Sequence, residues 1–291
     1  MTNTRVFALA ISPNGTDGTN LFAGTLGSGV FLSTDNGTSW TAASTGLTNT
    51  DVQALAVSPN GTGGTNLVAG TAGGGVFLST NDGSSWSAIG LPNTLVLALA
   101  VNGTNLFAGT LGSGVFLSTN NGTSWTAVNT GLTNTRVRAL AISPNGTGGT
   151  NLFAGTEGGG VFLSTNNGTS WTAASAGLTN KEVRALAVSG TNLFAGTFGG
   201  VFLSTNNGSS WTATSTGLTS TEVRALAVFG MNLFAGTSGG VFHSTDNGTS
   251  WTAASTGLPS AYPSTIVRAL AVSGTNLFAG THGGGVWRRP L

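Results

Sequence analysis

Four arginines occupy the same place in a recurring five-residue pattern and could together bind an anion. Each follows a valine and precedes Ala-Leu-Ala, and they are Arg138, Arg184, Arg224 and Arg268. Guanidinium groups bind carboxylates and phosphates through paired hydrogen bonds. Copies of one pattern take equivalent places in a repeat fold, so these side chains would face a common ligand such as an anion or an acidic sugar. The alternative is that they are solvated, or paired with acids such as Glu182 and Glu222.

A second variable position follows the recurring motif Asn-Leu-[Phe/Val]-Ala-Gly-Thr. Across the copies it holds Leu26, Ala72, Leu111, Glu157, Phe198, Ser238 and His282. Glycines follow it, which predicts a loop. The polar and aromatic members of this set are therefore further ligand-binding candidates, namely Glu157, Phe198, Ser238 and His282. Neutral drift between the copies is the alternative interpretation.

Nine asparagines begin Asn-Gly-Thr or Asn-Gly-Ser, which is the acceptor pattern for N-glycosylation. They are Asn14, Asn36, Asn60, Asn102, Asn121, Asn145, Asn167, Asn207 and Asn247. Asn-Gly also suits a tight hairpin turn, so a purely structural role is the alternative. Attached sugars would help a chain with only 9 basic and 8 acidic residues to stay soluble.

Catalytic and metal chemistry have no matching constellation in the sequence. The chain lacks cysteine, and its two histidines, His243 and His282, lie in different copies and at different places in the repeat, which does not suit a metal site. General glycoside hydrolysis needs a close pair of carboxylates, whereas the 8 acidic residues are scattered, mostly in predicted turns. We therefore predict no catalytic residue, no metal and no cofactor.

The composition excludes two classes of partner. The formal net charge is +1 and there is no basic cluster, which argues against a nucleic-acid partner. No apolar run approaches about 18 residues, so no membrane insertion is expected. The 48 glycines, together with many Ser, Thr and Asn residues, favour short strands and tight turns over helices.

Seven copies of one unit, 40 to 46 residues apart, position all of these side chains. The motif Val-x-Ala-Leu-Ala begins at Val6, Val52, Val96, Val137, Val183, Val223 and Val267. The second motif begins at Asn20, Asn66, Asn105, Asn151, Asn192, Asn232 and Asn276. A third motif, Gly-Val-Phe-[Leu/His]-Ser-Thr, appears in six copies, and Val286-Trp287 replaces it in the seventh.

Each copy predicts a four-stranded antiparallel meander. The three motifs and a final Trp-Thr-Ala segment are rich in strand-forming residues, and Gly-rich or Asn-Gly turns separate them. A sheet that is apolar on both faces cannot bury itself alone, so seven copies in a ring give an all-β, seven-bladed β-propeller. A parallel β-helix is the alternative, but its coils are usually shorter and need no hairpin between strands.

We expect a single propeller domain over residues 1–291, with blades near 5–50, 51–94, 95–135, 136–181, 182–221, 222–265 and 266–291. The seventh copy lacks a Trp-Thr-Ala segment, so the last blade should have three strands and the ring should close by packing of one sheet on the next. Its open edge would be guarded by Arg288, Arg289 and Pro290, or would pair with another chain.

The turn between the third and fourth strands resembles the Asp-box, also called the BNR or sialidase repeat, written S-x-D-x-G-x-[ST]-W. The first copy reads Ser33-Thr34-Asp35-Asn36-Gly37-Thr38-Ser39-Trp40, and the sixth copy carries Asp246. Asparagine replaces the aspartate in the other four, at Asn81, Asn120, Asn166 and Asn206. The resemblance implies a propeller like those of sialidases, sortilin-type receptors and secreted bacterial repeat proteins, with the box as a structural hairpin staple and not as a catalyst.

Sialidase chemistry would need three converging arginines, a nucleophilic tyrosine–glutamate pair and an acid. The only tyrosine, Tyr262, has no assigned glutamate partner. We therefore expect a non-enzymatic module of the cell surface with a structural, assembly or interaction role. A carbohydrate-binding, lectin-like propeller is the alternative, and a sialidase-like glycoside hydrolase is less favoured.

The surface, rich in Ser, Thr, Asn and Gly, favours an extracellular or cell-surface location. No signal peptide begins the chain, which predicts a mature domain, with an intracellular protein as the alternative. The final residues, Gly-Val-Trp-Arg-Arg-Pro-Leu, resemble the close of repeat domains in secreted bacterial proteins. The expected partners are other protein chains, including a second copy at the open edge, and glycans.

Overall fold

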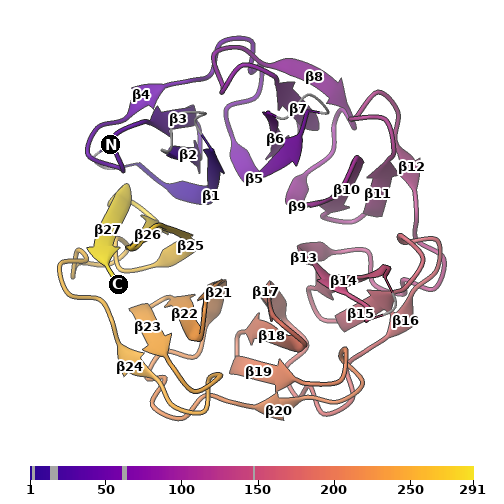
Figure 1. Cartoon of the computed structure of the whole chain (residues 1–291), viewed down its shortest axis with the longest axis vertical. Coiled ribbons are helices and arrows are strands. Elements are labelled where there is room, and N and C mark those ends of the chain that lie inside the picture. Colours follow the sequence, from indigo (N-terminus) through magenta and orange to yellow (C-terminus); the bar gives the residue numbers. More distant parts are fainter. Residues whose placement is uncertain (2–3, 14–18, 61–63, 147) are drawn as a thin grey trace.

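The computed structural model describes residues 1, 4–13, 19–60, 64–146 and 148–291. Their strands form seven antiparallel sheets that stand as blades around a central axis (Figure 1). Six sheets contain four strands in chain order, and the seventh contains three. The predicted seven-bladed, all-β propeller with a three-stranded last blade is therefore confirmed. The described residues form no helix, so they contain no helix that is long and apolar enough to cross a membrane.

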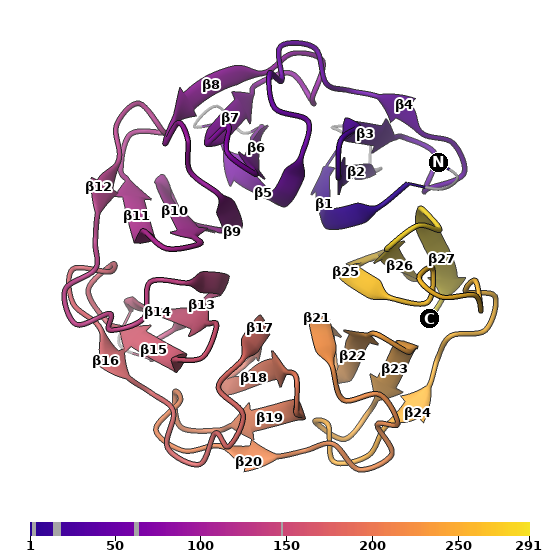
Figure 2. The ribbon, with the colours of Figure 1, turned by 180° about the vertical axis from the view of Figure 1, so that it is seen from behind.

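The first strand of each blade lies nearest the axis, as both views down the ring show (Figures 1 and 2). In blade 5, Val183 and Ala185 are buried between sheets, whereas Arg184 and Leu186 are partly exposed. Small alanines fit here because the sheets converge toward the axis. The first strands are β1 (Val6–Pro13), β5 (Val52–Pro59), β9 (Val96–Asn102), β13 (Val137–Pro144), β17 (Val183–Ser189), β21 (Val223–Phe229) and β25 (Val267–Ser273).

The second and third strands form the middle of each blade, and the second is buried over almost its whole length. The second strands are β2 (Thr19–Thr25), β6 (Thr65–Thr71), β10 (Asn105–Thr110), β14 (Thr150–Thr156), β18 (Asn192–Thr197), β22 (Asn232–Thr237) and β26 (Asn276–Thr281). The third strands are β3 (Gly29–Ser33), β7 (Val76–Ser79), β11 (Gly114–Ser118), β15 (Gly160–Ser164), β19 (Gly200–Ser204), β23 (Gly240–Ser244) and β27 (Val286–Pro290).

The fourth strands are short and lie on the outer rim. They are β4 (Thr41–Ala42), β8 (Ser87–Gly90), β12 (Thr126–Ala127), β16 (Thr172–Ala173), β20 (Thr212–Ala213) and β24 (Thr252–Ala253). The tryptophan just before each of them, except the first, donates its indole N–H to a carbonyl in or just after the fourth strand of the preceding blade. Trp171 Nε1, for example, lies 2.7 Å from Val128 O. The tryptophan of the turn therefore links two blades.

The hydrophobic core is divided into layers between neighbouring blades. One layer joins Phe153 and Leu178 of blade 4 with Leu193, Phe202 and Trp211 of blade 5. Equivalent clusters join the other consecutive blades from 1 to 7. Each sheet is covered on both faces only because its neighbours are present.

Every first strand carries a β-bulge at the residue after its initial valine. In blade 5, Val183 pairs with Thr197 and Ala185 pairs with Gly196, so Arg184 has no partner of its own. A bulge bends the strand and redirects the side chain of the extra residue. The bulged residues are Phe7, Gln53, Leu97, Arg138, Arg184, Arg224 and Arg268.

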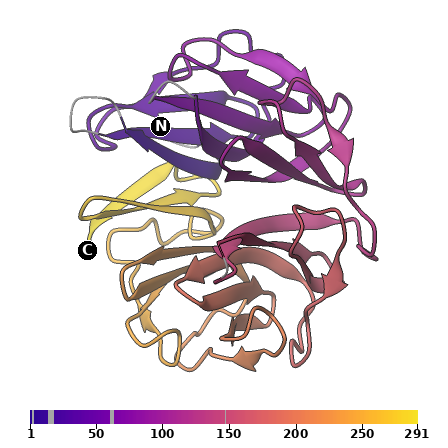
Figure 3. The same cartoon turned by 45° about the vertical axis from the view of Figure 1, so that its right-hand side comes forward.

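The ring closes between blade 7 and blade 1 through main-chain hydrogen bonds as well as packing. Gly285 N donates to Thr4 O at 3.1 Å, and Arg5 forms an antiparallel bridge with His282. Figure 3 shows β25 to β27 lying between the first blade and the orange sixth blade. Closure therefore involves more than the sheet packing that the sequence predicted.

The outer edge of β27 has no partner strand among the described residues. Arg288 and Pro290 are exposed there, and Arg288 Nη1 donates to Asn36 O of blade 1 at 2.8 Å. Trp40 of blade 1 has no fourth strand of a preceding blade to contact and instead donates to Gly37 O of its own turn at 3.2 Å.

Candidate functional site

The seven bulged residues meet around one end of the axis. They line a hollow of about 100 Å³, with Phe7, Gln53 and Leu97 from blades 1 to 3 on one side and the four arginines from blades 4 to 7 on the other. We call this hollow the mouth. The repeat pattern predicted that the four arginines face a common ligand, and the structure brings their side chains together at the mouth. Binding of a ligand by these arginines stays a prediction.

Each arginine of the mouth contacts the variable residue of its own blade, so the two predicted candidate sets form one site. The reason lies in the pairing: the valine before the bulge pairs with the threonine that ends the second strand, and the variable residue follows that threonine. The four contacts are Arg138 Nε to Glu157 Oε2 at 2.6 Å, the Arg184 guanidinium 4.4 Å from the Phe198 ring centre, Arg224 Nε to Ser238 Oγ at 3.3 Å and Arg268 Nε to His282 Nδ1 at 2.7 Å.

Two of the four arginines are neutralised by carboxylates. Glu157 accepts from Arg138 and also from Arg136 Nη2 at 3.1 Å. Burial alone would raise the pKa of Glu157, but the hydrogen bonds from the two arginines outweigh it and lower the pKa below its usual value. Arg224 forms an ion pair with Glu222, which Ser238 also contacts.

Arg136 was not among the predicted site residues. It stands two residues before Arg138, a spacing that places both on one face of an extended chain, and that spacing was the available signal. Its pairing with Glu157 makes the blade 4 side of the mouth an ionic network of three side chains.

The other two arginines, Arg184 and Arg268, have no ion pair with a carboxylate within the described parts of the chain. Arg184 lies on Phe198, and its buried Nε has no hydrogen-bond partner. Burial and then the nearby Arg138 lower the pKa of Arg184. Burial and then Arg224 lower the pKa of Arg268 to about 10. These two guanidinium groups are charged, partly dehydrated and not neutralised.

His282 and Phe7 hold Arg268 in place. His282 Nδ1 accepts from Arg268, so the neutral ring carries its proton on Nε2. Burial, and then the charge of Arg268, lower the pKa of His282. The Arg268 guanidinium also lies 4.6 Å from the centre of the Phe7 ring, which meets the His282 ring edge to face at 6.1 Å. The aromatic face of Phe7 favours the charged form of the arginine.

Below the mouth, the axis continues as a channel of about 220 Å³ lined by alanines and leucines of the first strands. Every blade contributes the leucine of its Val-x-Ala-Leu-Ala motif, as blades 5 and 6 contribute Leu186 and Leu226. Gln53 and Leu97 line both the mouth and the channel, so the two spaces adjoin.

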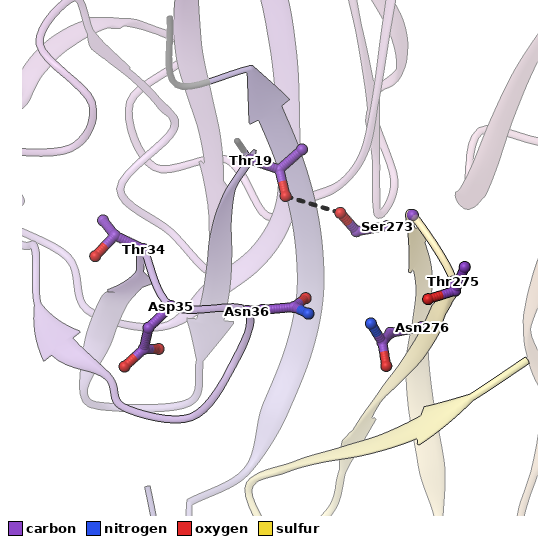
Figure 4. Close-up of a pocket in the computed structure, with 8 residues that line it drawn as sticks. Thr19, Thr34, Asp35, Asn36, Ser273, Thr275 and Asn276 are labelled. Carbon is purple, nitrogen blue, oxygen red and sulfur yellow. Dashed lines mark hydrogen bonds between the residues drawn. The ribbon is translucent and has the colours of Figure 1, made fainter. Parts of the chain in front are cut away.

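A cavity of about 410 Å³ lies at the seam between blades 1 and 7 (Figure 4). Its side chains carry hydroxyl and amide groups, and Thr19 Oγ1 and Ser273 Oγ are hydrogen-bonded at 2.8 Å. Figure 4 shows Asn36 and Asn276 pointing toward one another across it. The cavity is lined by the first turn of blade 7 and the third turn of blade 1.

The Asp-box-like turns are held by their own side chains. In blade 1, Asp35 Oδ1 accepts from Ser33 Oγ at 2.8 Å and Ser39 N at 2.9 Å. The hydrogen bonds of these serine and backbone donors, that of the Ser39 side chain first, lower the pKa of Asp35 to about 2, and an equivalent set does the same for Asp246. Where asparagine replaces aspartate, as at Asn166, its amide oxygen accepts the same two bonds. The side chain at this position shapes the turn.

The predicted glycosylation acceptors among the described residues belong to turns on one face. The strands of a blade are antiparallel and follow chain order, so the first and third turns lie at one end of the blade and the second turn lies at the other. The variable residues that contact the arginines of the mouth follow the second strands, so the first and third turns lie on the face opposite the mouth. Asn14 lies outside the described residues. The acceptors in the third turns have φ between 53° and 58° and are exposed, and they are Asn36, Asn121, Asn167, Asn207 and Asn247. The acceptors in the described first turns are partly buried, and they are Asn60, Asn102 and Asn145.

The remaining reactive side chains are dispersed. Tyr262 is 81% exposed in the connection between β24 and β25. His243 stacks on Phe234 at 4.7 Å, and its Nε2 lies 2.7 Å from Asn232 Oδ1. Over the described ranges, no three His, Asp or Glu side chains gather as a metal site would require.

A family model described as the DUF6242 beta propeller domain matches residues 145–281, which is less than half of the chain. No curated protein matches the sequence. The family match and the structure agree on a propeller.

Solved structures with the same architecture come from proteins of several kinds. The extracellular domain of the hybrid two component system BT4673 from B. thetaiotaomicron has a TM-score of 0.77 and 16% identity, over 98% of this chain and 38% of the other. The GH74 xyloglucanase from Xanthomonas campestris has a TM-score of 0.75 and 18% identity, over 99% of this chain and 52% of the other. YCF48 from Cyanidioschyzon merolae has a TM-score of 0.68 and 14% identity, over 99% and 96%. At these identities the likeness shows the fold alone, and the chain spans about two fifths of the length of the two component proteins.

Proposed function

We propose that the protein is a non-enzymatic, extracellular recognition module of the Asp-box type that binds an anionic ligand at the mouth. One observation carries this proposal: two positions at which near-identical repeats differ meet at a single opening, and four of the seven blades supply an arginine at one of these positions. Repeats that serve only packing need no such local difference. The resemblance of the fold to extracellular domains of two component systems supports an extracellular location.

The two glutamates at the mouth are paired with arginines, and this pairing agrees better with ligand binding than with catalysis. Glu157 forms ion pairs with Arg136 and Arg138, and Glu222 forms an ion pair with Arg224. Hydrolysis of a glycoside requires one carboxylic acid that keeps its proton and a second carboxylate near it. The lowered pKa of Glu157 is the opposite of what a general acid needs.

The test is binding of an acidic glycan array by the purified chain and by Arg184→Gln. Among the described residues the buried Nε of Arg184 has no hydrogen-bond partner, so replacement of Arg184 should leave the near-UV circular dichroism spectrum unchanged. We expect binding to acidic glycans to weaken about tenfold or more, because a charged hydrogen bond is lost. No binding of any glycan or small anion by the native chain would refute the proposal, and turnover of a fluorogenic sialoside would refute its non-enzymatic part.

Glycosylation of the turn asparagines fits the same arrangement. Sugars on the face opposite the mouth would increase solubility and leave the mouth open. The intact mass of the protein secreted from its natural host tests this directly. A mass equal to that of the bare chain would assign the Asn-Gly pairs to turn formation alone.

The edge of β27 favours a second candidate function, a subunit that assembles with a second copy. Unpaired strand edges can pair with one another across a two-fold axis. Arg288 and Arg289 oppose this pairing through like charge, so it should require high salt. Sedimentation over a range of protein and salt concentrations decides between the two: a monomer under all conditions would exclude self-assembly.

A further inference from the structure

We propose that the ligand is a small amphiphilic carboxylate, whose head group binds between Arg184 and Arg268 and whose apolar tail enters the leucine-lined channel. This inference rests on the proposed function and specifies the class of ligand. It comes from the position of the two arginines without an ion pair at the mouth, which adjoins the channel lined by alanine and leucine side chains.

The head group is assigned by the charges that remain at the mouth. Arg138 and Arg224 are already paired with Glu157 and Glu222, whereas Arg184 and Arg268 have no carboxylate partner among the described residues. A carboxylate presents two oxygens in the geometry that a guanidinium group binds. The mouth, of about 100 Å³, has room for a head group of this size.

The tail is assigned by what lies below the mouth. The channel of about 220 Å³ is lined by the alanines and leucines of the first strands, with no charged side chain. A methylene group is of similar size to a water molecule, so the channel has room for an alkyl tail of roughly six to eight carbons. Gln53 and Leu97 border both spaces, so a bound molecule would extend from the mouth into the channel past one amide and one leucine side chain.

The remaining surface of the mouth agrees with an amphiphile. Leu97 forms an apolar part of the rim, and Phe7 lies beside Arg268. A ligand pocket is typically apolar, with a few polar groups that fix the orientation of the ligand. An entirely polar ligand, such as an acidic sugar, would leave the channel and this rim without a function.

The experiment is isothermal titration calorimetry of the full chain with sodium butanoate, hexanoate and octanoate at neutral pH and low salt. Burial of each methylene should tighten binding about fourfold until the channel is full. Octyltrimethylammonium, which has the same tail and the opposite charge, should not bind. An affinity that does not change with tail length would overturn the inference, because the tail would then lie in water.

Three variants assign the two halves of the ligand. Arg184→Gln and Arg268→Gln should each weaken octanoate binding about tenfold or more, whereas Arg288→Gln, on the edge strand, should leave it unchanged. Leu226→Phe fills part of the channel and should reduce the gain from hexanoate to octanoate while butanoate still binds. Should that variant fail to fold, the tail-length series on the native chain still decides the question.

The controls separate this inference from the proposed function. Binding of sialyllactose that is lost in Arg184→Gln, together with no binding of octanoate, would overturn the amphiphile and leave an anion-binding module. If neither sialyllactose nor octanoate binds, both the anion-binding function and the amphiphilic ligand are refuted.

Discussion

Arg184 and Arg268 are charged groups that lose water on folding and gain no carboxylate in return. Burial is the largest cause of the lowered pKa of each, and a neighbouring arginine adds to it. Such an arrangement destabilises the free protein relative to one with neutral side chains at these positions. Proteins retain locally destabilising groups of this kind at sites where binding of a ligand offsets the destabilisation.

Replacement of Arg268 by glutamine should therefore stabilise the free protein. The folded-state pKa of Arg268 is about 10, below its ordinary value of 12.5, so folding disfavours the charged form at every pH below 10. Solvent screens this partly exposed group, and we expect a rise in Tm of roughly 2–4 °C. Thermal unfolding followed by circular dichroism measures it. Arg224→Gln is the control, because it breaks an ion pair with Glu222 and should not raise Tm; an equal rise in both variants would contradict the explanation.

His282 should make the fold sensitive to mild acid. Its folded-state pKa lies below 6.5, because burial and the charge of Arg268 disfavour the imidazolium. Below pH 6.5 the unfolded chain therefore binds a proton that the folded chain does not, and stability falls as the pH is lowered. Urea unfolding at pH 7.5 and 5.5 should show a smaller loss in His282→Asn than in the native chain. Some loss should remain, because the pKa of His243 is lowered in the same direction, and an identical loss in both would exclude a role for His282.

At the scale of the element, the blade is a meander whose turns contact the neighbouring blades as well as its own strands. The tryptophan of the third turn is the clearest case: Trp211 donates to Ala174 O and Trp251 to Thr214 O, both at 2.8 Å and both across a blade boundary. The seven repeats are nearly identical, yet Trp40 lacks this link because blade 7 has no fourth strand.

The contribution of this hydrogen bond to the free energy of unfolding can be measured by comparing Trp171→Phe with Trp40→Phe. The first change removes the hydrogen bond to Val128 O from a side chain that is only 3% exposed, and it should lower the free energy of unfolding by about 1–3 kcal/mol. The second removes a bond within one turn of a partly exposed residue and should cost less than about 1 kcal/mol. Urea denaturation gives both values, and equal losses would mean that the indole link between blades adds nothing.

At the scale of the whole molecule, seven interfaces share one geometry and one of them has no covalent connection. In each blade a glycine near the end of the second strand lies against the first valine of the next blade. A Cβ on Gly155 would meet Val183 Cγ1 at 2.6 Å, and a Cβ on Gly280 would meet Val6 Cγ1 at 2.6 Å. Neither glycine has a positive φ, so close approach of the sheets, and not backbone conformation, requires glycine at these places. Gly280 stands at the seam that closes the ring.

Gly280→Ala should therefore open the ring locally, whereas Gly155→Ala should lower stability without such opening. Both create an overpacked contact worth about 1–3 kcal/mol. Blades 4 and 5 are joined through the chain, but blades 1 and 7 can separate while the other interfaces persist. Hydrogen exchange read by mass spectrometry should show faster exchange in β1 and β25 for Gly280→Ala. Faster exchange spread evenly over all blades in both variants would show that the seam is no weaker than the other interfaces.

Local patterns in the sequence determined the number of copies, the strands and turns of each copy, and the missing strand of the last blade. Alternation of side chains and the turn preferences of Gly and Asn-Gly act over a few residues, so they can be recognised without knowledge of the ring. The same patterns placed Arg138, Arg184, Arg224 and Arg268 at one opening, because equivalent residues of a closed repeat must meet.

Only the tertiary structure decided which of these arginines are neutralised and which are not. A bulge in each first strand turns the residue toward the axis, where its partner comes from beyond the second strand, and Glu157, Phe198, Ser238 and His282 give four different environments. The acceptors of the turn tryptophans from Trp86 to Trp251 were likewise decided by the neighbouring blade. Contacts of this kind depend on distances between segments far apart in the chain, and those distances are set by the packing of one sheet on another.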